Sequence, residues 1–168
     1  MEIQFASMSR KIAGTAIPVF SLRSEGSYGV GDFGDLKTLV DWAVHTHQQA
    51  IQILPINDTT ISNTWMDSYP YNSISIYAFH PMYIDLRQLG KMKDKEAAAA
   101  FEKKRLELNA LPEVDYEGVN NAKREYIRLM FQQTGKKVLA STEFKQFFKE
   151  NEHWLLPYAA FSHLRDQY

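Results

Sequence analysis

Cysteine is absent from this sequence of 168 residues. Its absence excludes disulfides, thiolate metal sites and cysteine nucleophiles, and it suits a reducing environment, so we expect a cytoplasmic protein. Long apolar runs are also absent, because no stretch approaches the roughly 20 residues needed to span a bilayer. The first residues, MEIQFASMSRK, contain no apolar segment of signal-peptide length, and we therefore expect no membrane partner.

The sequence also lacks an excess of charge of either sign. It has 19 Lys and Arg residues and 20 Asp and Glu residues, which give a formal net charge of −1. A surface that binds nucleic acid normally carries a basic excess to neutralise phosphates, so nucleic acid is not an expected partner. The residues that are present, 45% hydrophobic and 23% charged, are typical of an ordinary globular chain.

The first part of the chain predicts one strand–helix–strand unit. An uncharged, β-branched and aromatic segment at 12–22 is typical of a strand buried on both faces. Apolar residues at helical spacing within 36–44 predict an amphipathic helix with Asp35 as its N-cap. A second short apolar run follows at 50–56. The two strands are therefore expected to pair in parallel, joined by the crossover helix.

The second part is expected to be mostly helical. Residues 77–86 predict a third short strand, which Pro81 makes irregular or confines to an edge. Gly135 is expected to end one helix, and Pro157 to lie in the first turn of another. Helices are predicted over residues 95–108, 116–134, 143–149 and 155–168. Two or three strands followed only by helices cannot cover both faces of a sheet, so we expect the chain to be part of a longer protein.

A glycine-rich turn precedes the first predicted helix. Residues 29–34 match G-x-G-x-x-G between a strand and a helix, a pattern typical of dinucleotide-binding proteins. However, Asp32 and Asp35 place negative charge where a pyrophosphate would bind. Asp58, the candidate ribose ligand, lies beyond the usual spacing of about 20 residues. A structural glycine turn is favoured, and a nucleotide-binding module remains the alternative.

A segment rich in aromatic and amide side chains, 65–73 (WMDSYPYNS), follows the second predicted strand. Ligands of parallel α/β proteins bind at the carboxyl ends of the strands. Aromatic rings cover the C–H face of a pyranose, and Asp and Asn side chains bind its hydroxyls, so a sugar site is one interpretation of this segment. From these residues alone, a loop that packs its own aromatic residues is the favoured interpretation.

No catalytic centre is predicted in this chain. The five His residues show no H-E-x-x-H pattern and are expected mostly at the surface or as caps, so no metal or cofactor is predicted. The serines lie in no G-x-S-x-G turn. Retaining glycosidases need two carboxylates about 5–5.5 Å apart. The spacing of Asp32, Asp35, Asp58 and Asp67 identifies no such pair.

Three segments together resemble the start of glycoside hydrolase family 77, the 4-α-glucanotransferases. They are GSYGVGDFGDL, IQILPIND and DSYPYNSISIYAFHPMYIDL. The form DSYPYNS and the final segment HWLLPYAAFSHLRD are similar to the branch that includes the plant cytosolic disproportionating enzyme. The resemblance covers residues 13–168.

The resemblance implies a (β/α)8 barrel with inserted helical subdomains. The fold class would be α/β, with residues 1–90 starting the catalytic barrel and residues 91–168 forming a helical insertion. A complete barrel typically needs about 250 residues, so the barrel would be incomplete here. The implied reaction is a retaining transfer of α-1,4-glucosyl units between maltose, maltooligosaccharides and glucans, with release of glucose. The family's catalytic carboxylates lie on later strands, so this chain alone is expected to be inactive.

The resemblance also implies which residues bind the sugar. Tyr71 would stack on the sugar whose bond is formed and broken, and Asp67 would hold the loop or a sugar hydroxyl. Tyr69 and Asn72 replace the Ser and Gln of the family's S-P-Y-Q motif, and Trp65 would be a further sugar platform. Apolar surface left exposed by missing strands would favour self-association. A non-catalytic carbohydrate-binding domain is a further alternative to the enzyme.

Overall fold

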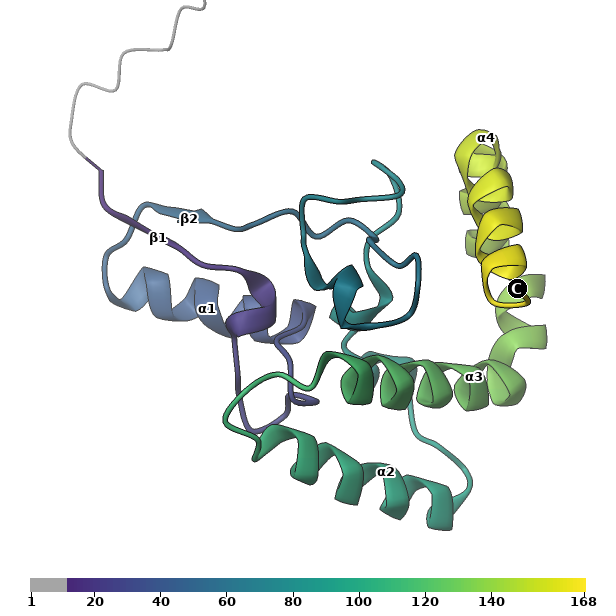
Figure 1. The fold of residues 1–168 in the computed structure, drawn as a ribbon, viewed down its shortest axis with the longest axis horizontal. Coiled ribbons are helices and arrows are strands. Elements are labelled where there is room, and N and C mark those ends of the chain that lie inside the picture. Colours follow the sequence, from purple (N-terminus) through teal and green to yellow (C-terminus); the bar gives the residue numbers. More distant parts are fainter. Residues whose placement is uncertain (1–11) are drawn as a thin grey trace, which may run out of the picture.

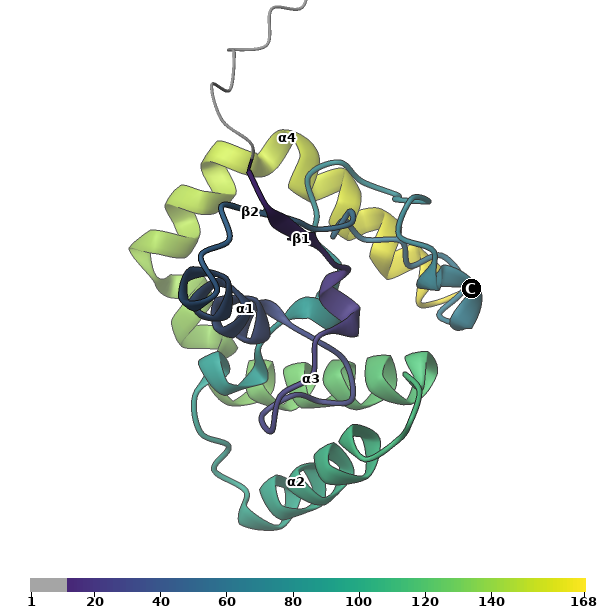
Figure 2. The same ribbon diagram turned by 90° about the vertical axis from the view of Figure 1, so that its left-hand side faces the viewer.

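The computed structural model describes residues 12–168, which form a mixed α/β structure that is mostly helical (Figures 1 and 2). Its sheet has two strands, β1 (Gly14–Ala16) and β2 (Ala50–Gln52), joined through helix α1 (Phe33–His45). Three longer helices follow: α2 (Lys95–Asn109), α3 (Tyr116–Ala140) and α4 (Thr142–Arg165). Short 3₁₀ turns lie before α2: η1 (Val19–Ser21) follows β1, and η2 (Trp65–Ser68), η3 (Pro81–Tyr83) and η4 (Leu86–Leu89) follow β2.

The two strands pair in parallel, as predicted, with Thr15 opposite Ile51. The prediction that residues 12–22 form a strand buried on both faces is wrong. Only Gly14–Ala16 forms a strand, and both end residues of this strand are exposed. Pro18 supplies no N–H to a ladder and leads directly into η1, and each strand of a two-stranded sheet is an edge that faces solvent.

The predicted third strand over residues 77–86 does not form. A single antiparallel bridge joins Asn57 to Phe79, and the chain then enters η3 and η4. Pro81 is the first residue of η3, where its missing N–H and fixed φ suit a helical turn better than a ladder.

Helix boundaries differ from the predictions where capping and packing decide them. Asp32, rather than Asp35, is the N-cap of α1, and Asp35 completes a reciprocal capping box. Gly135 does not end α3, which continues to Ala140, and Gly135 lies buried beside the ring of Phe131. The predicted helices at 143–149 and 155–168 are one helix, α4, with Pro157 inside it.

The main apolar cluster lies away from the sheet, between the glycine-rich turn, the segment around η3 and η4, and helices α2 and α3. Figure 2 shows these segments together below the strands. Its buried side chains are Val19, Tyr28, Val30, Met82, Tyr83, Leu86, Leu108, Tyr116, Val119 and Ala122. Because the cluster draws on both halves of the chain, the helices fix the position of the loops that follow the strands.

A lysine is buried at the edge of this cluster. The amine of Lys123, on α3, donates to the carbonyls of Met82 and Ile84 at 2.7 and 2.9 Å. It also forms an ion pair with Asp32, whose Oδ2 lies 3.6 Å away. Burial lowers the pKa of Lys123 and raises that of Asp32, and the attraction between the two charges opposes both shifts.

We predict that Lys123→Met lowers the free energy of unfolding by about 3–5 kcal/mol, because it removes the ion-pair partner of the buried Asp32 carboxylate and leaves two carbonyls without their donor. Urea denaturation measures this change. The control is Lys103→Met on α2, which removes an exposed ion pair with Glu107 and should cost at most about 1 kcal/mol. Equal effects of the two substitutions would contradict a structural role for the buried amine.

Candidate functional site

A cavity of about 410 Å³ opens beyond the carboxyl ends of both strands. Residues that follow β1 and β2 line one side of it, and residues of η3 and the start of α3 line the other. The lining from the loop after β2 comprises Trp65, Asp67, Ser68 and Pro70. This location is the one at which parallel α/β proteins bind ligands, and it agrees with the position predicted for the aromatic segment.

Residues 58–78, which we call the aromatic loop, leave and rejoin the structure through a narrow neck. The neck is closed by the Asn57–Phe79 bridge and by the hydrogen bond from the amide of Asp58 to the carbonyl of Ala78, at 2.9 Å. Inside the loop, the amide of Ile74 donates to the carbonyl of Asp58 at 2.8 Å. Figure 1 shows the loop between the end of β2 and helix α4.

Asp67 organises the first turn of the aromatic loop. Its buried carboxylate accepts hydrogen bonds from the amides of Ser62 and Asn63, at 2.9 and 2.7 Å, and from the hydroxyl of Ser62 at 3.1 Å. Asn63 has a positive φ of 59°, a conformation that these bonds hold in place. These bonds shape the first turn of the loop, and a bond from Asp67 to a sugar hydroxyl stays a prediction.

The aromatic side chains of the loop project outward. Trp65, Tyr69 and Tyr71 are 69%, 61% and 59% exposed, so the loop does not bury its own rings. The rings of Tyr69 and Tyr71 lie 5.5 Å apart and are inclined by 50°. Asn72 is also exposed, and its backbone N–H donates to the carbonyl of Tyr69.

The structure brings the five sequence-predicted residues onto one loop but not onto one surface. Trp65 and Asp67 line the cavity, whereas Tyr69, Tyr71 and Asn72 lie outside its lining. The arrangement offers exposed ring faces beside a partly apolar cavity, which suits a ligand with C–H faces and hydroxyl edges.

His80 is a buried cavity residue that the sequence reasoning treated only as one of several surface or capping histidines. It does cap η3, because its Nδ1 accepts from the amide of Met82 at 3.1 Å. The neutral ring therefore carries its proton on Nε2, which lies 2.9 Å from the hydroxyl of Tyr116. The sequence feature that could have singled out His80 is its position directly before Pro81, inside the segment that resembles family 77.

Burial lowers the pKa of His80 to about 4. The carboxylates of Asp58 and Asp67 favour the protonated ring, whereas the guanidinium groups of Arg124 and Arg165 oppose it. Desolvation is the largest of these influences, so the ring stays neutral over most of the pH range in which the protein would work.

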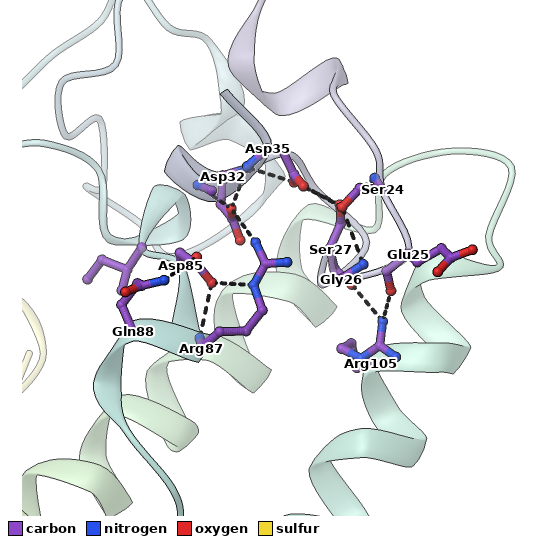
Figure 3. A network of polar contacts seen from close by, with 12 residues as sticks. Ser24, Glu25, Gly26, Ser27, Asp32, Asp35, Asp85, Arg87, Gln88 and Arg105 are labelled. Atoms are coloured by element: carbon purple, nitrogen blue, oxygen red, sulfur yellow. Dashed lines mark hydrogen bonds and ion pairs between the residues drawn. The ribbon is translucent and has the colours of Figure 1, made fainter. Parts of the chain in front are cut away.

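The glycine-rich turn is a packing and capping element in this structure. The carboxylate of Asp32 accepts from the amides of Gly34 and Asp35, at 2.9 and 3.2 Å, and Asp35 accepts from the hydroxyls of Ser24 and Ser27 (Figure 3). The amides that a pyrophosphate would need at the start of α1 are therefore already bonded. The geometry speaks against the nucleotide-binding alternative.

Close packing explains why glycine is needed in this turn. Gly29 has a φ of 77°, and a Cβ there would meet Leu108 of α2. A Cβ at Gly31 would collide with the carbonyl of Val19.

Within residues 12–168, no three His, Asp or Glu side chains come close enough together to hold a metal ion.

Comparisons with known proteins identify the family to which this chain belongs. The family model for glycoside hydrolase family 77, described as 4-alpha-glucanotransferase, matches residues 17–168. The chain is 48% identical over 159 residues to the 4-alpha-glucanotransferase DPE2 of rice, Oryza sativa subsp. japonica. It is 37% and 34% identical to the 4-alpha-glucanotransferases of Chlamydia caviae and Chlamydia trachomatis, over 153 and 154 residues respectively.

The chain therefore belongs to the 4-α-glucanotransferase family. The matches cover 92%, 90% and 91% of this chain for the rice, C. caviae and C. trachomatis proteins. They cover only 16%, 28% and 28% of those relatives, so the chain spans a small part of each. In the described part of the chain, 12–168, none of the helices combines the length and the apolar character needed to cross a membrane.

We predict that stability falls as the pH drops from about 6.5 to 4 through the titration of His80. Its folded-state pKa of about 4 lies below the value of 6.5 for an unperturbed histidine, so the unfolded chain binds the proton first. Between pH 6.5 and 4, the titration of His80 lowers the free energy of unfolding by about 3 kcal/mol. His80→Gln, which keeps an N–H donor but does not titrate, should lack this component.

Urea denaturation of the wild type and of His80→Gln at pH 7 and pH 4 measures how much of the pH dependence of stability comes from His80. His163→Gln, at an exposed position on α4, is the matched substitution control. The same pH dependence in the wild type and in His80→Gln would show that His80 is not neutral and buried in solution.

Proposed function

We propose that this chain forms part of the donor-sugar site of a 4-α-glucanotransferase, an enzyme that moves α-1,4-glucosyl units between maltose, maltooligosaccharides and glucans and releases glucose. The observation that carries the proposal is the aromatic loop, which presents Tyr71 and Tyr69 to solvent at the carboxyl end of a parallel strand pair. Membership of the family supports the same assignment.

The proposed role of Tyr71 is to cover the C–H face of the reacting glucose with its ring. Tyr69, tilted against it, would support that ring, and Trp65 would offer a further sugar platform beside the cavity. Asn72, exposed at the same tip, has an amide suited to a sugar hydroxyl. Asp67 would contribute by holding the loop in shape, through the bonds described above.

The reaction that we propose is a retaining double displacement. A carboxylate attacks the anomeric carbon, a second carboxylic acid protonates the leaving oxygen, and a sugar hydroxyl then takes the place of water as acceptor. We assign neither carboxylate to residues 1–168, and we propose that polypeptide equivalent to the remainder of the relatives supplies both. No cofactor is needed for this chemistry.

The proposed architecture is the beginning of a (β/α)8 barrel in residues 1–90, followed by a helical insertion in residues 91–168. The parallel pair β1–β2, with α1 between the strands in sequence, is the repeating unit that such a barrel requires. Further strands would cover the exposed edges of this pair, and without them the chain would self-associate. A cytoplasmic location, suited to a chain without cysteine, belongs to the same proposal.

We predict that Tyr71→Ala in the full-length enzyme lowers kcat/KM for glucosyl transfer from maltotriose by about 100-fold, because the reacting sugar loses the ring that aligns it. Tyr71→Phe keeps the ring and should retain most of the activity. Tyr168→Ala, at a fully exposed position, is the control for substitution alone. An unchanged kcat/KM in Tyr71→Ala would remove the stacking role from the proposal.

Residues 1–168 by themselves should show no glucosyl transfer, because they span only 16% of the rice relative and 28% of the C. caviae relative. The measurement is release of glucose and formation of longer oligosaccharides from maltotriose by the purified chain. Turnover above that of a mock purification would mean that a catalytic carboxylate pair lies within this chain.

A further inference from the structure

Helix α4 contacts the aromatic loop through one stripe of side chains. Trp154, Tyr158 and Arg165 are spaced by four and by seven residues, which places them on the same face of the helix. All three reach segments that lie about 80–100 residues earlier in the sequence. Figures 1 and 2 both show the final turns of α4 beside this loop.

The stripe holds the two ends of the loop rather than its tip. The hydroxyl of Tyr158 donates to Oδ2 of Asp58, the first residue of the loop, at 2.5 Å. The ring of Trp154 stacks on Tyr77, next to the last residue of the loop, at 5.5 Å and an angle of 17°. Arg165 donates to the carbonyl of Thr60 at 2.9 Å.

Asp58 depends on these contacts because its side chain is only 1% exposed. Its other carboxylate oxygen, Oδ1, accepts from the amide and the hydroxyl of Thr60, at 3.0 and 2.6 Å. Removal of the Tyr158 hydroxyl would therefore leave one oxygen of a buried carboxylate without its donor. Burial and the bond to Asp58 raise the pKa of Tyr158, so the phenol stays a donor.

Packing alone does not fix the position of the neck. Asp58, Thr60 and His80 line a cavity of about 280 Å³ together with residues of α3 and α4. Side chains around such a space lack some of the contacts that would resist a shift. The directed hydrogen bond and the ring stack therefore help to set the angle of the loop. Farther into the loop, the amide of Trp65 donates to the carboxylate of Glu117 on α3 at 3.0 Å.

We infer that Tyr158 is a positioning residue for glucosyl transfer: through Asp58 it holds the neck of the aromatic loop, and so sets where the rings of Tyr69 and Tyr71 meet the sugar. This inference rests on the proposed function, and it adds to that function a residue of α4 that does not touch the substrate. Trp154 acts on the other end of the same neck.

The test compares Tyr158→Phe with wild type in the full-length enzyme. Amide hydrogen exchange within residues 61–76 should become about tenfold faster, the factor expected for loss of one hydrogen bond to a charged group, whereas exchange in α2 should not change. Transfer from maltotriose should fall about tenfold in kcat/KM at a temperature well below the unfolding transition. Tyr126→Phe, on α3 and away from the loop, is the matched control.

A second variant and a coupling measurement separate positioning from general destabilisation. Trp154→Leu should accelerate exchange in the same loop segment. Asp58→Asn combined with Tyr158→Phe should cost no more activity than Asp58→Asn alone, because each substitution removes the same contact, the hydrogen bond from Tyr158 to the Asp58 carboxylate.

Each remaining outcome decides against the inference. Unchanged loop exchange in Tyr158→Phe would overturn it and leave the proposed function standing, as would faster loop exchange with unchanged kcat/KM. Exchange accelerated equally in α2 and in the loop would reduce Tyr158 to an ordinary structural residue. A wild-type enzyme without transferase activity would overturn the proposed function and this inference together.

Discussion

The buried amine of Lys123 determines how the two halves of this structure meet. It bonds the carbonyls of Met82 and Ile84, which follow the aromatic loop, and pairs with Asp32, which caps α1. One side chain of α3 therefore fixes the crossover helix and the return of the loop relative to each other. Burial disfavours the charges of both Lys123 and Asp32, so this ion pair is stable only because the amine and the carboxylate are each paired or hydrogen-bonded.

This anchoring leaves the sheet and helix α1 with exposed surface. The main cluster packs beneath the loops, whereas Val40, Trp42 and Val44 of α1 are 46%, 48% and 66% exposed. Apolar surface of this kind is typical of a face that another element covers. In the proposed barrel, further strand–helix units would cover this apolar surface. The described residues would be the part in which the aromatic loop is already held.

The sequence predicted what depends on periodicity and on strong local signals. The parallel pair, the helix over 95–108 and the position of the aromatic loop at a strand end are confirmed. The predicted helix ends were wrong because Gly135 and Pro157 were treated as boundaries. Gly135 lies buried within α3 beside the ring of Phe131. Pro157 lies within α4, where it removes one backbone hydrogen bond and crowds the carbonyl four residues before it. The burial of His80 depends on contacts with α3, which no local pattern encodes.

The aromatic loop reverses the usual distribution of side chains. Its rings face solvent, whereas Asp58, Thr60 and His80 are buried at its base. Burying polar groups costs free energy unless each finds a partner in the correct direction. Apolar residues at the base would bury more favourably, but they could slide, because dispersion contacts have no preferred direction. A polar base permits few orientations, so the hydrogen bonds that Asp58 accepts fix the angle at which Tyr69 and Tyr71 are presented.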